Sequence, residues 1–186
     1  MSIPPRFIAI LFCFVLVLPA QSQIMQDARS LEQGALSFHL AGAVFAFDGV
    51  STLTGHARVR YGLSERIDLT LRAGISEVED TYGGAQLDIL MRDEPPFVSL
   101  SAGGHFQKDP AVDGTLNATW PLPNNIHIYS GVDFDLVFDD DPDLPAWAFL
   151  GTLLPIRRSI DINLEIAVGL VPIASEVFTA GFVFSF

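Results

Sequence analysis

Apolar and polar residues alternate with a period of two along most of the chain beyond residue 34. In the stretch 160–170, Ile, Leu and Val occupy the even-numbered positions, while Asp161, Asn163 and Glu165 lie among the odd-numbered ones. Because successive side chains of a strand point to opposite faces, this pattern predicts a strand with one apolar and one polar face. The same alternation recurs at 126–138 and 67–76, and no stretch after residue 34 sustains a helical period.

Turn signals divide this pattern into ten predicted strands. They cover residues 35–47, 51–61, 66–76, 84–92, 97–107, 114–121, 126–138, 146–154, 159–170 and 176–186. The first and eighth alternate poorly and the sixth is short, so eight strands remain the alternative. Connections that fall on one side of such an array are compact and rich in Pro, Asn and Gly, as tight hairpins require. These connections lie near residues 62–66, 92–96, 121–125 and 155–159.

The N-terminus has the pattern of a secretory signal sequence. Phe7 to Leu18 is an unbroken apolar run, shorter than the ~20 residues that a membrane-spanning helix needs. Small residues at positions 20 and 22 predict cleavage between Ser22 and Gln23, with an uncleaved inner-membrane anchor as the alternative. The predicted organisation is therefore a signal peptide over 1–22, a polar lead-in over 23–33 and one β-barrel domain over 34–186.

Composition narrows the chemistry that such a domain can perform. The formal net charge is −12, which argues against nucleic acid as a partner because phosphate binding needs a basic face. The single cysteine, Cys13, lies inside the predicted signal sequence. The predicted mature chain therefore has neither disulfides nor thiol chemistry.

An amphipathic barrel either buries its apolar face, as lipocalins do, or exposes it to lipid. A soluble barrel needs a wide polar outer surface, whereas this chain has a single lysine, Lys108, and its polar face carries many small residues. Aromatic residues near predicted strand ends suit the interfacial girdles of a membrane barrel. These residues are Tyr61, Trp120, Phe138, Trp147 and Phe186. The pattern thus favours the membrane barrel over the soluble one.

The last nine residues place phenylalanine at positions 178, 182, 184 and 186, with Ala180 on the same predicted face. This ending resembles the C-terminal signal of small bacterial outer-membrane β-barrel proteins, and the stretch 62–69 is similar to a turn-and-strand phrase of that superfamily. The resemblance implies an all-β, closed, antiparallel, up-and-down transmembrane β-barrel with both termini on the periplasmic side. It also implies insertion into the bacterial outer membrane by the barrel-assembly machinery, which recognises the strand that ends at Phe186. Outer-membrane lipid and lipopolysaccharide are then the expected partners.

Alternation assigns a set of charged and polar side chains to the lumen. They are His56, Arg58, Arg60, Asp68, Arg72, Asp88, Asp133, Asp135, Asp161 and Glu165. A barrel of eight to ten strands is about wide enough for side chains to fill it, so a polar plug of paired groups is predicted. The alternative is a narrow cation path, because acids outnumber arginines in this set.

The remaining candidates for chemistry do not form a recognisable centre. His39, His56, His105 and His127 all face inward but at different heights, which argues against a shared metal. Ser101 and His105 are about 13 Å apart along one strand, while His105, Asp109 and Asp113 flank one connection and form a possible acid–histidine pair. The acidic run Asp139 to Asp143 lacks the glycine and distal glutamate of a calcium loop.

The sequence therefore predicts no catalytic, cofactor or metal residues. The expected role is structural or surface-interacting, with a polar, plugged lumen. A narrow pore or passive transport protein is the alternative. The third class is a lipid A-modifying enzyme or an outer-membrane protease. The sequence does not predict the oligomeric state.

Overall fold

The computed structural model describes residues 27–47, 50–76, 81–138 and 143–186. Within these ranges the chain forms ten strands, which confirms the predicted number over the alternative of eight. The predicted signal sequence and the first residues of the lead-in lie outside the described residues. The strands are β1 (Leu36–Phe47), β2 (Val50–Ser64), β3 (Ile67–Ser76), β4 (Tyr82–Arg92), β5 (Phe97–Phe106), β6 (Pro110–Pro121), β7 (His127–Val137), β8 (Ala146–Arg157), β9 (Ile160–Gly169) and β10 (Glu176–Ser185).

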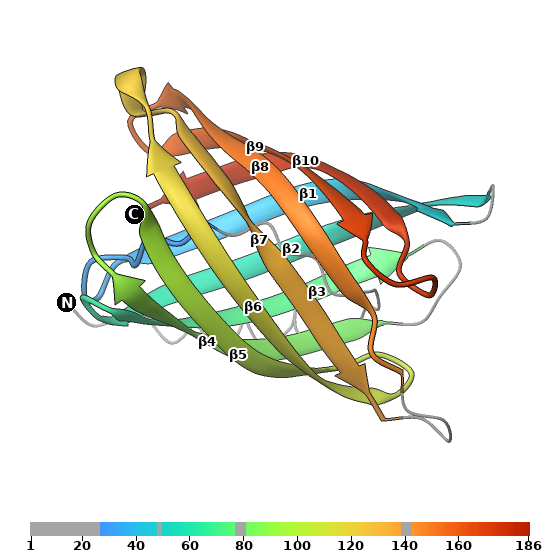
Figure 1. Cartoon of the computed structure of the whole chain (residues 1–186). Helices are drawn as coiled ribbons and strands as arrows, with labels where there is room; N and C mark the ends of the chain where they lie inside the picture. The colour runs from blue at the N-terminus through green and yellow to red at the C-terminus, as the bar shows by residue number, and fades with distance from the viewer. Residues whose placement is uncertain (1–26, 48–49, 77–80, 139–142) are drawn as a thin grey trace, which may run out of the picture.

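The strands close into an antiparallel barrel in which each strand pairs with its neighbours in sequence (Figure 1). β10 completes the circle against β1, where Leu36 and Phe186 exchange backbone hydrogen bonds of 3.2 and 2.9 Å. Closure leaves no unpaired strand edge, as a sheet surrounded by lipid requires. The predicted closed up-and-down topology is therefore confirmed.

The two ends of the barrel differ in their connections. The end that holds Leu36 and Phe186, called here the terminal end, carries the turns at 65–66, 93–96, 122–126 and 158–159, close to the predicted positions. In the third turn a 3₁₀ helix over Pro123–Asn125 places Asn124 and Asn125 at φ of 64° and 58°. Asparagine tolerates this left-handed region better than other side chains, which explains its use there. The opposite end, called the far end, carries the connections 48–49, 77–81, 107–109, 138–145 and 170–175.

The described residues contain no helix that is long and apolar enough to cross a membrane.

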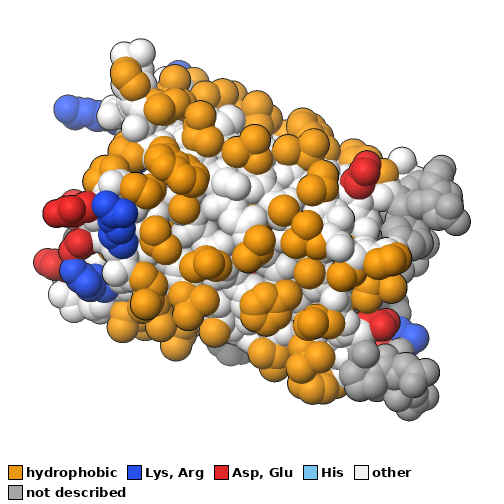
Figure 2. Space-filling model, viewed as in Figure 1, with side chains coloured by type: hydrophobic (Ala, Val, Ile, Leu, Met, Phe, Trp, Pro, Cys, Tyr) orange, Lys and Arg blue, Asp and Glu red, His pale blue; other side chains and the backbone are white. Residues whose placement is uncertain are grey.

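Large apolar side chains cover the outside of the barrel wall. Figure 2 shows hydrophobic side chains over the middle of one face, with charged side chains gathered at the two ends. On β10 this outer set includes Phe178 and Phe182, which are 53% and 48% exposed, while Val177 and Val183 lie buried on the other side. The alternation predicted an apolar outer face, and the exposure of these side chains confirms it.

Four of the five predicted girdle residues lie on this outer face, but Trp147 does not. Tyr61, Trp120, Phe138 and Phe186 are exposed near strand ends. Trp147 is buried and its indole Nε1 donates a 2.9 Å hydrogen bond to the backbone carbonyl of Ser175.

The prediction for Trp147 was wrong because β8 is apolar on both faces. Ala148 and Leu150 lie on the outer face, whereas Trp147, Phe149 and Leu153 lie on the inner one. Alternation between two apolar sets gives no contrast from which a face can be assigned.

Candidate functional site

The lumen holds nearly all of the charged groups that alternation assigned to it. Nine of the ten predicted inward residues are at most 7% exposed, and the tenth, Asp161, is half-buried near the terminal end. A buried charge is tolerated only when it is paired or hydrogen-bonded. The charged groups of the lumen and their partners form one cluster near each end of the barrel.

Arg60 is the centre of the group at the terminal end, called here the Arg60 cluster. Its guanidinium lies 2.7 Å from a carboxylate oxygen of Asp68, 3.4 Å from Asp27 and 3.9 Å from Asp88. Asp88 also accepts hydrogen bonds from Thr70 Oγ1 at 2.5 Å and from Gln86 Nε2 at 2.6 Å. One cation thus binds three strands and the N-terminal part of the chain together.

Residues 27–35, called the N-terminal segment, enter the barrel at this end and contact the inner wall. The backbone N–H of Ala28 donates to Thr119 Oγ1 on β6 at 2.7 Å, and the N–H of Leu31 donates to Asp68 on β3 at 3.1 Å. Arg60 also donates to the backbone carbonyl of Arg29. Asp27 and Ala28 are 6% and 1% exposed, so this part of the chain lies inside the lumen.

The close approach of this segment depends on Gly62. A Cβ atom at Gly62 would lie 2.2 Å from the carbonyl oxygen of Glu32, far inside van der Waals contact. Gly34, with φ +84°, makes the turn that leads from the segment into β1. The position of residues 27–33 inside the barrel could not be predicted from the sequence, because a short polar stretch without periodicity carries no signal for position.

Electrostatics hold the start of the segment in place. Burial alone would raise the pKa of Asp27, but the guanidinium groups of Arg29 and Arg60 outweigh it and hold this pKa below its usual value. Arg29 contacts Asp27 directly and reaches His127 Nε2 at 3.1 Å. The ionised carboxylate of Asp27 is therefore the form that the native lumen stabilises.

A hydrogen-bonded group around Tyr129 links β7 to β9 inside the lumen. The Tyr129 hydroxyl donates to Glu165 Oε2 at 2.9 Å and accepts from Asn163 Nδ2 at 2.7 Å. The ring passes directly over Gly151, where a Cβ would lie 2.1 Å from Tyr129 Cζ. Tyr129 is fully buried, so it links the polar part of the lumen to the apolar part beside it.

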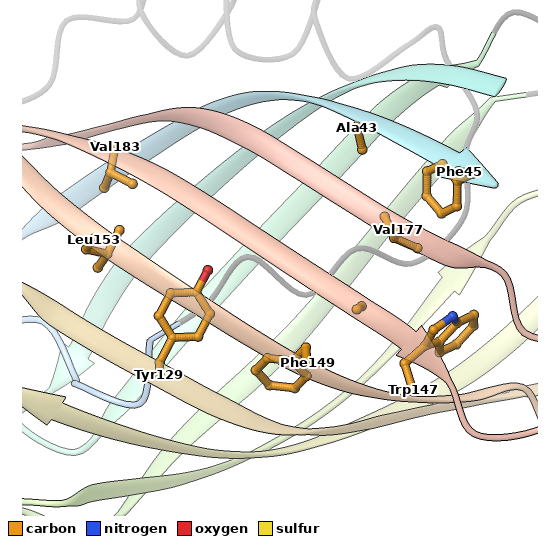
Figure 3. Packing of buried hydrophobic residues seen from close by; sticks show 9 residues of the cluster. Ala43, Phe45, Tyr129, Trp147, Phe149, Leu153, Val177 and Val183 are labelled. Atoms are coloured by element: carbon orange, nitrogen blue, oxygen red, sulfur yellow. The ribbon is translucent and has the colours of Figure 1, made fainter. Parts of the chain in front are cut away.

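The apolar part of the lumen is a packed cluster on one side of the barrel, called here the apolar wall. Figure 3 shows these side chains directed inward from β1, β7, β8 and β10. The cluster consists of Ala43, Phe45, Tyr129, Trp147, Phe149, Leu153, Ala167, Val177 and Val183. The side chains that fill this part of the lumen therefore need no ionic partners.

A second charged group, the far-end cluster, lies near the opposite opening. His105 Nδ1 is 3.0 Å from Asp113 Oδ2, and Arg72 contacts the same oxygen. The Tyr82 ring packs 5.2 Å from the His105 ring and 5.5 Å from Arg72 Cζ. Asp135 completes the cluster, since it offers a carboxylate oxygen within 4.8 Å of ligand atoms on His105 and Asp113.

The predicted acid–histidine pair is thus confirmed for His105 and Asp113. For Asp109, the contact in the turn is a backbone one, in which its carbonyl accepts a hydrogen bond from the N–H of Gln107. Ser101 lies deeper in the barrel, where it pairs across the sheet with Asp88 on β4 and Thr115 on β6. Alternation predicted Asp135 in the lumen but not its proximity to His105. Alternation gives the face of a side chain, while its height depends on the tilt and stagger of the strands.

The other candidate residues are dispersed. His56 Nε2 lies 2.7 Å from Thr54 Oγ1, and His127 contacts Arg29 at the terminal end. Within the described ranges, His105 is the histidine that lies with two acids at ligand spacing. Most of the acidic run, 139–142, lies outside the described residues, and Asp143 forms a β-bridge with Val137.

Comparison with solved structures identifies the fold class. The NanC porin matches with a TM-score of 0.52 at 6% identity, covering 80% of this chain and 100% of the porin chain. The translocator domain of the autotransporter NalP from Neisseria meningitidis also has a TM-score of 0.52, at 10% identity, covering 84% of this chain and 90% of that domain. No protein-family model and no curated relative matches the sequence. The chain therefore has the fold of outer-membrane β-barrels, which confirms the resemblance at the level of fold.

Proposed function

We propose that this protein is a bacterial outer-membrane β-barrel with a closed lumen and a structural or surface-interaction role. The observation that carries the proposal is the Arg60 cluster, in which the N-terminal segment is held inside the barrel by Arg60, Asp68 and Thr119. A segment bonded to both β3 and β6 occupies the lumen between them. The lumen is closed at the terminal end by the chain itself.

The outer-membrane location rests on three features that agree. The outer face is apolar, the barrel is closed, and the last strand presents alternating phenylalanines that end at Phe186. Outer-membrane lipid and lipopolysaccharide then surround the wall, and the barrel-assembly machinery recognises β10. The signal sequence over 1–22, with cleavage between Ser22 and Gln23, supplies the export step that this location requires.

Fractionation combined with heat-modifiability tests the location. The proposal predicts that the protein sediments with the outer membrane and that boiling shifts its mobility on a detergent gel. Phe186→Asp is expected to reduce the amount of protein in the outer-membrane fraction. Phe106→Asp, at an exposed strand end on the far side, is the control because it leaves the C-terminal strand intact. A soluble periplasmic protein without a mobility shift would contradict the proposal.

Planar-bilayer recording tests the closed lumen. The purified protein is expected to give no stable single-channel steps. The alternative function, a narrow cation pore, is favoured by the three carboxylates of Asp113, Asp133 and Asp135 near the far end. Stable cation-selective steps that change on Asp133→Asn or Asp135→Asn would establish the pore and overturn the closed lumen.

The His105–Asp113 pair favours a third function, hydrolysis of a lipid or peptide substrate at the far end. A histidine oriented by a carboxylate is the arrangement of a general base. Hydrolytic activity of the wild-type protein that is lost in His105→Ala would support this function over the structural one.

A further inference from the structure

The far-end cluster contains the donor set of a cation site. His105 Nδ1 and Asp113 Oδ2 are 3.0 Å apart, and Asp135 has an oxygen within 4.8 Å of both partners' ligand atoms. Two ligands bound to one metal at about 2.1 Å lie roughly 3.0–3.4 Å from each other. The first two atoms therefore already have the separation of neighbouring ligands.

Carboxylates outnumber guanidinium groups at the cluster. Three buried carboxylates, those of Asp113, Asp133 and Asp135, act on the guanidinium of Arg72. Arg58, the next cation in the lumen, also acts on Asp133, but it is shared with Asp88 and Glu165. An excess of buried carboxylates inside a narrow lumen favours a further cation as counter-ion.

The Tyr82 hydroxyl and Asp133 Oδ2 are buried oxygens at the cluster without a hydrogen-bond partner among the described residues. Tyr82 and Asp133 are each 2% exposed. Tyr82 packs against both His105 and Arg72, and Asp133 lies two residues before Asp135 on the same face of β7. Buried polar atoms are nearly always satisfied in native proteins, so these oxygens are available to a bound water or ion at the cluster.

We propose that the far-end cluster binds one divalent transition-metal cation through His105, Asp113 and Asp135. One imidazole with carboxylates suits Zn²⁺ or Mn²⁺, whereas Ca²⁺ prefers oxygen ligands alone. Arg72 keeps its contact with Asp113 as the outer partner that orients this carboxylate, a common arrangement around metal ligands. The cation ties β5, β6 and β7 together near the far opening.

Calorimetric titration of ZnCl₂ or MnCl₂ into the folded, detergent-solubilised protein, first treated with EDTA, tests the site. We expect saturable binding of one cation per chain, with CaCl₂ binding at least tenfold more weakly. His105→Ala and Asp135→Asn are each expected to lower the affinity by at least tenfold. The matched controls are His39→Ala, a buried histidine near the terminal end, and Asp143→Asn, an exposed acid of the 138–145 connection. Both controls are expected to bind as the wild type does.

Heat-modifiability shows that each variant is folded before it is titrated. It also provides a second readout, because a bound cation raises the temperature at which the barrel opens. Zn²⁺ is expected to raise this temperature in the wild type and in His39→Ala but not in His105→Ala. The absence of saturable binding by the folded wild type would overturn the proposal, as would equal affinity in His105→Ala. Loss of binding in Asp143→Asn would place the cation on the connection instead and overturn it as well.

Discussion

The inner faces of β2 to β6 carry mostly charged and hydroxyl side chains, whereas β8, β10 and β1 turn Trp147, Val177 and Phe45 toward the same lumen. The first side, called here the polar wall, is held by specific partners such as those of Arg60 and Arg72. The apolar wall is held by packing, which needs shape but no particular partner. The N-terminal segment bonds to β2, β3 and β6 of the polar wall, and its Arg29 also contacts His127 at the start of β7.

This difference predicts how each side fails. On the polar wall, removal of one charge leaves its partners buried and uncompensated, so a single substitution damages a whole cluster. On the apolar wall, the loss depends on the volume removed and on how far the neighbours close the gap.

Replacement of Arg60 is expected to have the largest effect. Arg60→Met leaves Asp27, Asp68 and Asp88 without their shared cation, and breaking a buried ion pair in this way costs about 3–5 kcal/mol. Urea unfolding in lipid vesicles measures this loss. Arg66→Met is the matched control, because Arg66 and its partner Asp93 are both 57% exposed and a surface pair contributes at most about 1 kcal/mol. Equal losses in the two variants would show that Arg60 is not a structural centre.

The two faces of β8 offer a direct comparison on the apolar wall. Leu153→Ala, at a position 5% exposed inside the lumen, is expected to cost about 2–5 kcal/mol because it leaves a cavity. Leu150→Ala, at a position 53% exposed on the outer face, is expected to cost less since lipid fills the space. The same unfolding experiment measures both. A larger loss at Leu150 would mean that the assigned faces of β8 are reversed.

A smaller effect is expected at the boundary between the two walls. Gly151→Ala places a methyl group 2.1 Å from the Tyr129 ring, and such overpacking typically costs about 1–3 kcal/mol. Gly83→Ala is the control, because a Cβ there meets nothing within 4 Å. Tyr129 fluorescence in Gly151→Ala is expected to change as the ring moves away from Asn163 and Glu165. Unchanged stability and fluorescence would contradict the packing of the Tyr129 ring over Gly151.

Acid is expected to weaken the anchor of the N-terminal segment by a smaller amount. The native pKa of Asp27 lies below its ordinary value of 3.8, so its contribution is complete above that value and is lost as the pH falls through the native pKa. Proteolytic release of the segment should therefore increase only under acidic conditions. In Asp27→Asn the pH dependence of this release should disappear. If the variant kept the pH profile of the wild type, the dependence would belong to another titrating group.

The fold could be predicted from the sequence to the extent that the two faces of each strand differ in polarity. β9 was placed within one residue at each end because its outer face is Ile, Leu and Val and its inner face contains Asp161, Asn163 and Glu165. β6 begins at Pro110, whereas the prediction placed its start at residue 114. The prediction started too late because Pro110 and Asp113 are residue types that are common in turns. Trp147 was assigned to the wrong face because both sides of β8 are apolar.

The sites were less predictable than the fold for a physical reason. The sequence assigned both Asp68 and Arg60 to the lumen, but it gave no indication that Asp27 and Leu31 reach them from a segment without periodicity. Likewise, Asp135 meets His105 only through the tilt of strands that are not adjacent along the chain.

Single-channel recording of Gly62→Ala tests the central claim, that the N-terminal segment closes the lumen against the polar wall. A Cβ at this position overlaps the backbone of Glu32 and displaces the segment without changing a charge, while Gly83→Ala serves as the control. No steps are expected in the wild type or in Gly83→Ala, and stable or flickering steps are expected in Gly62→Ala. Steps of equal size in all three proteins would contradict the closed lumen. It would also be contradicted if protease removed the displaced segment from Gly62→Ala and the barrel still gave no steps.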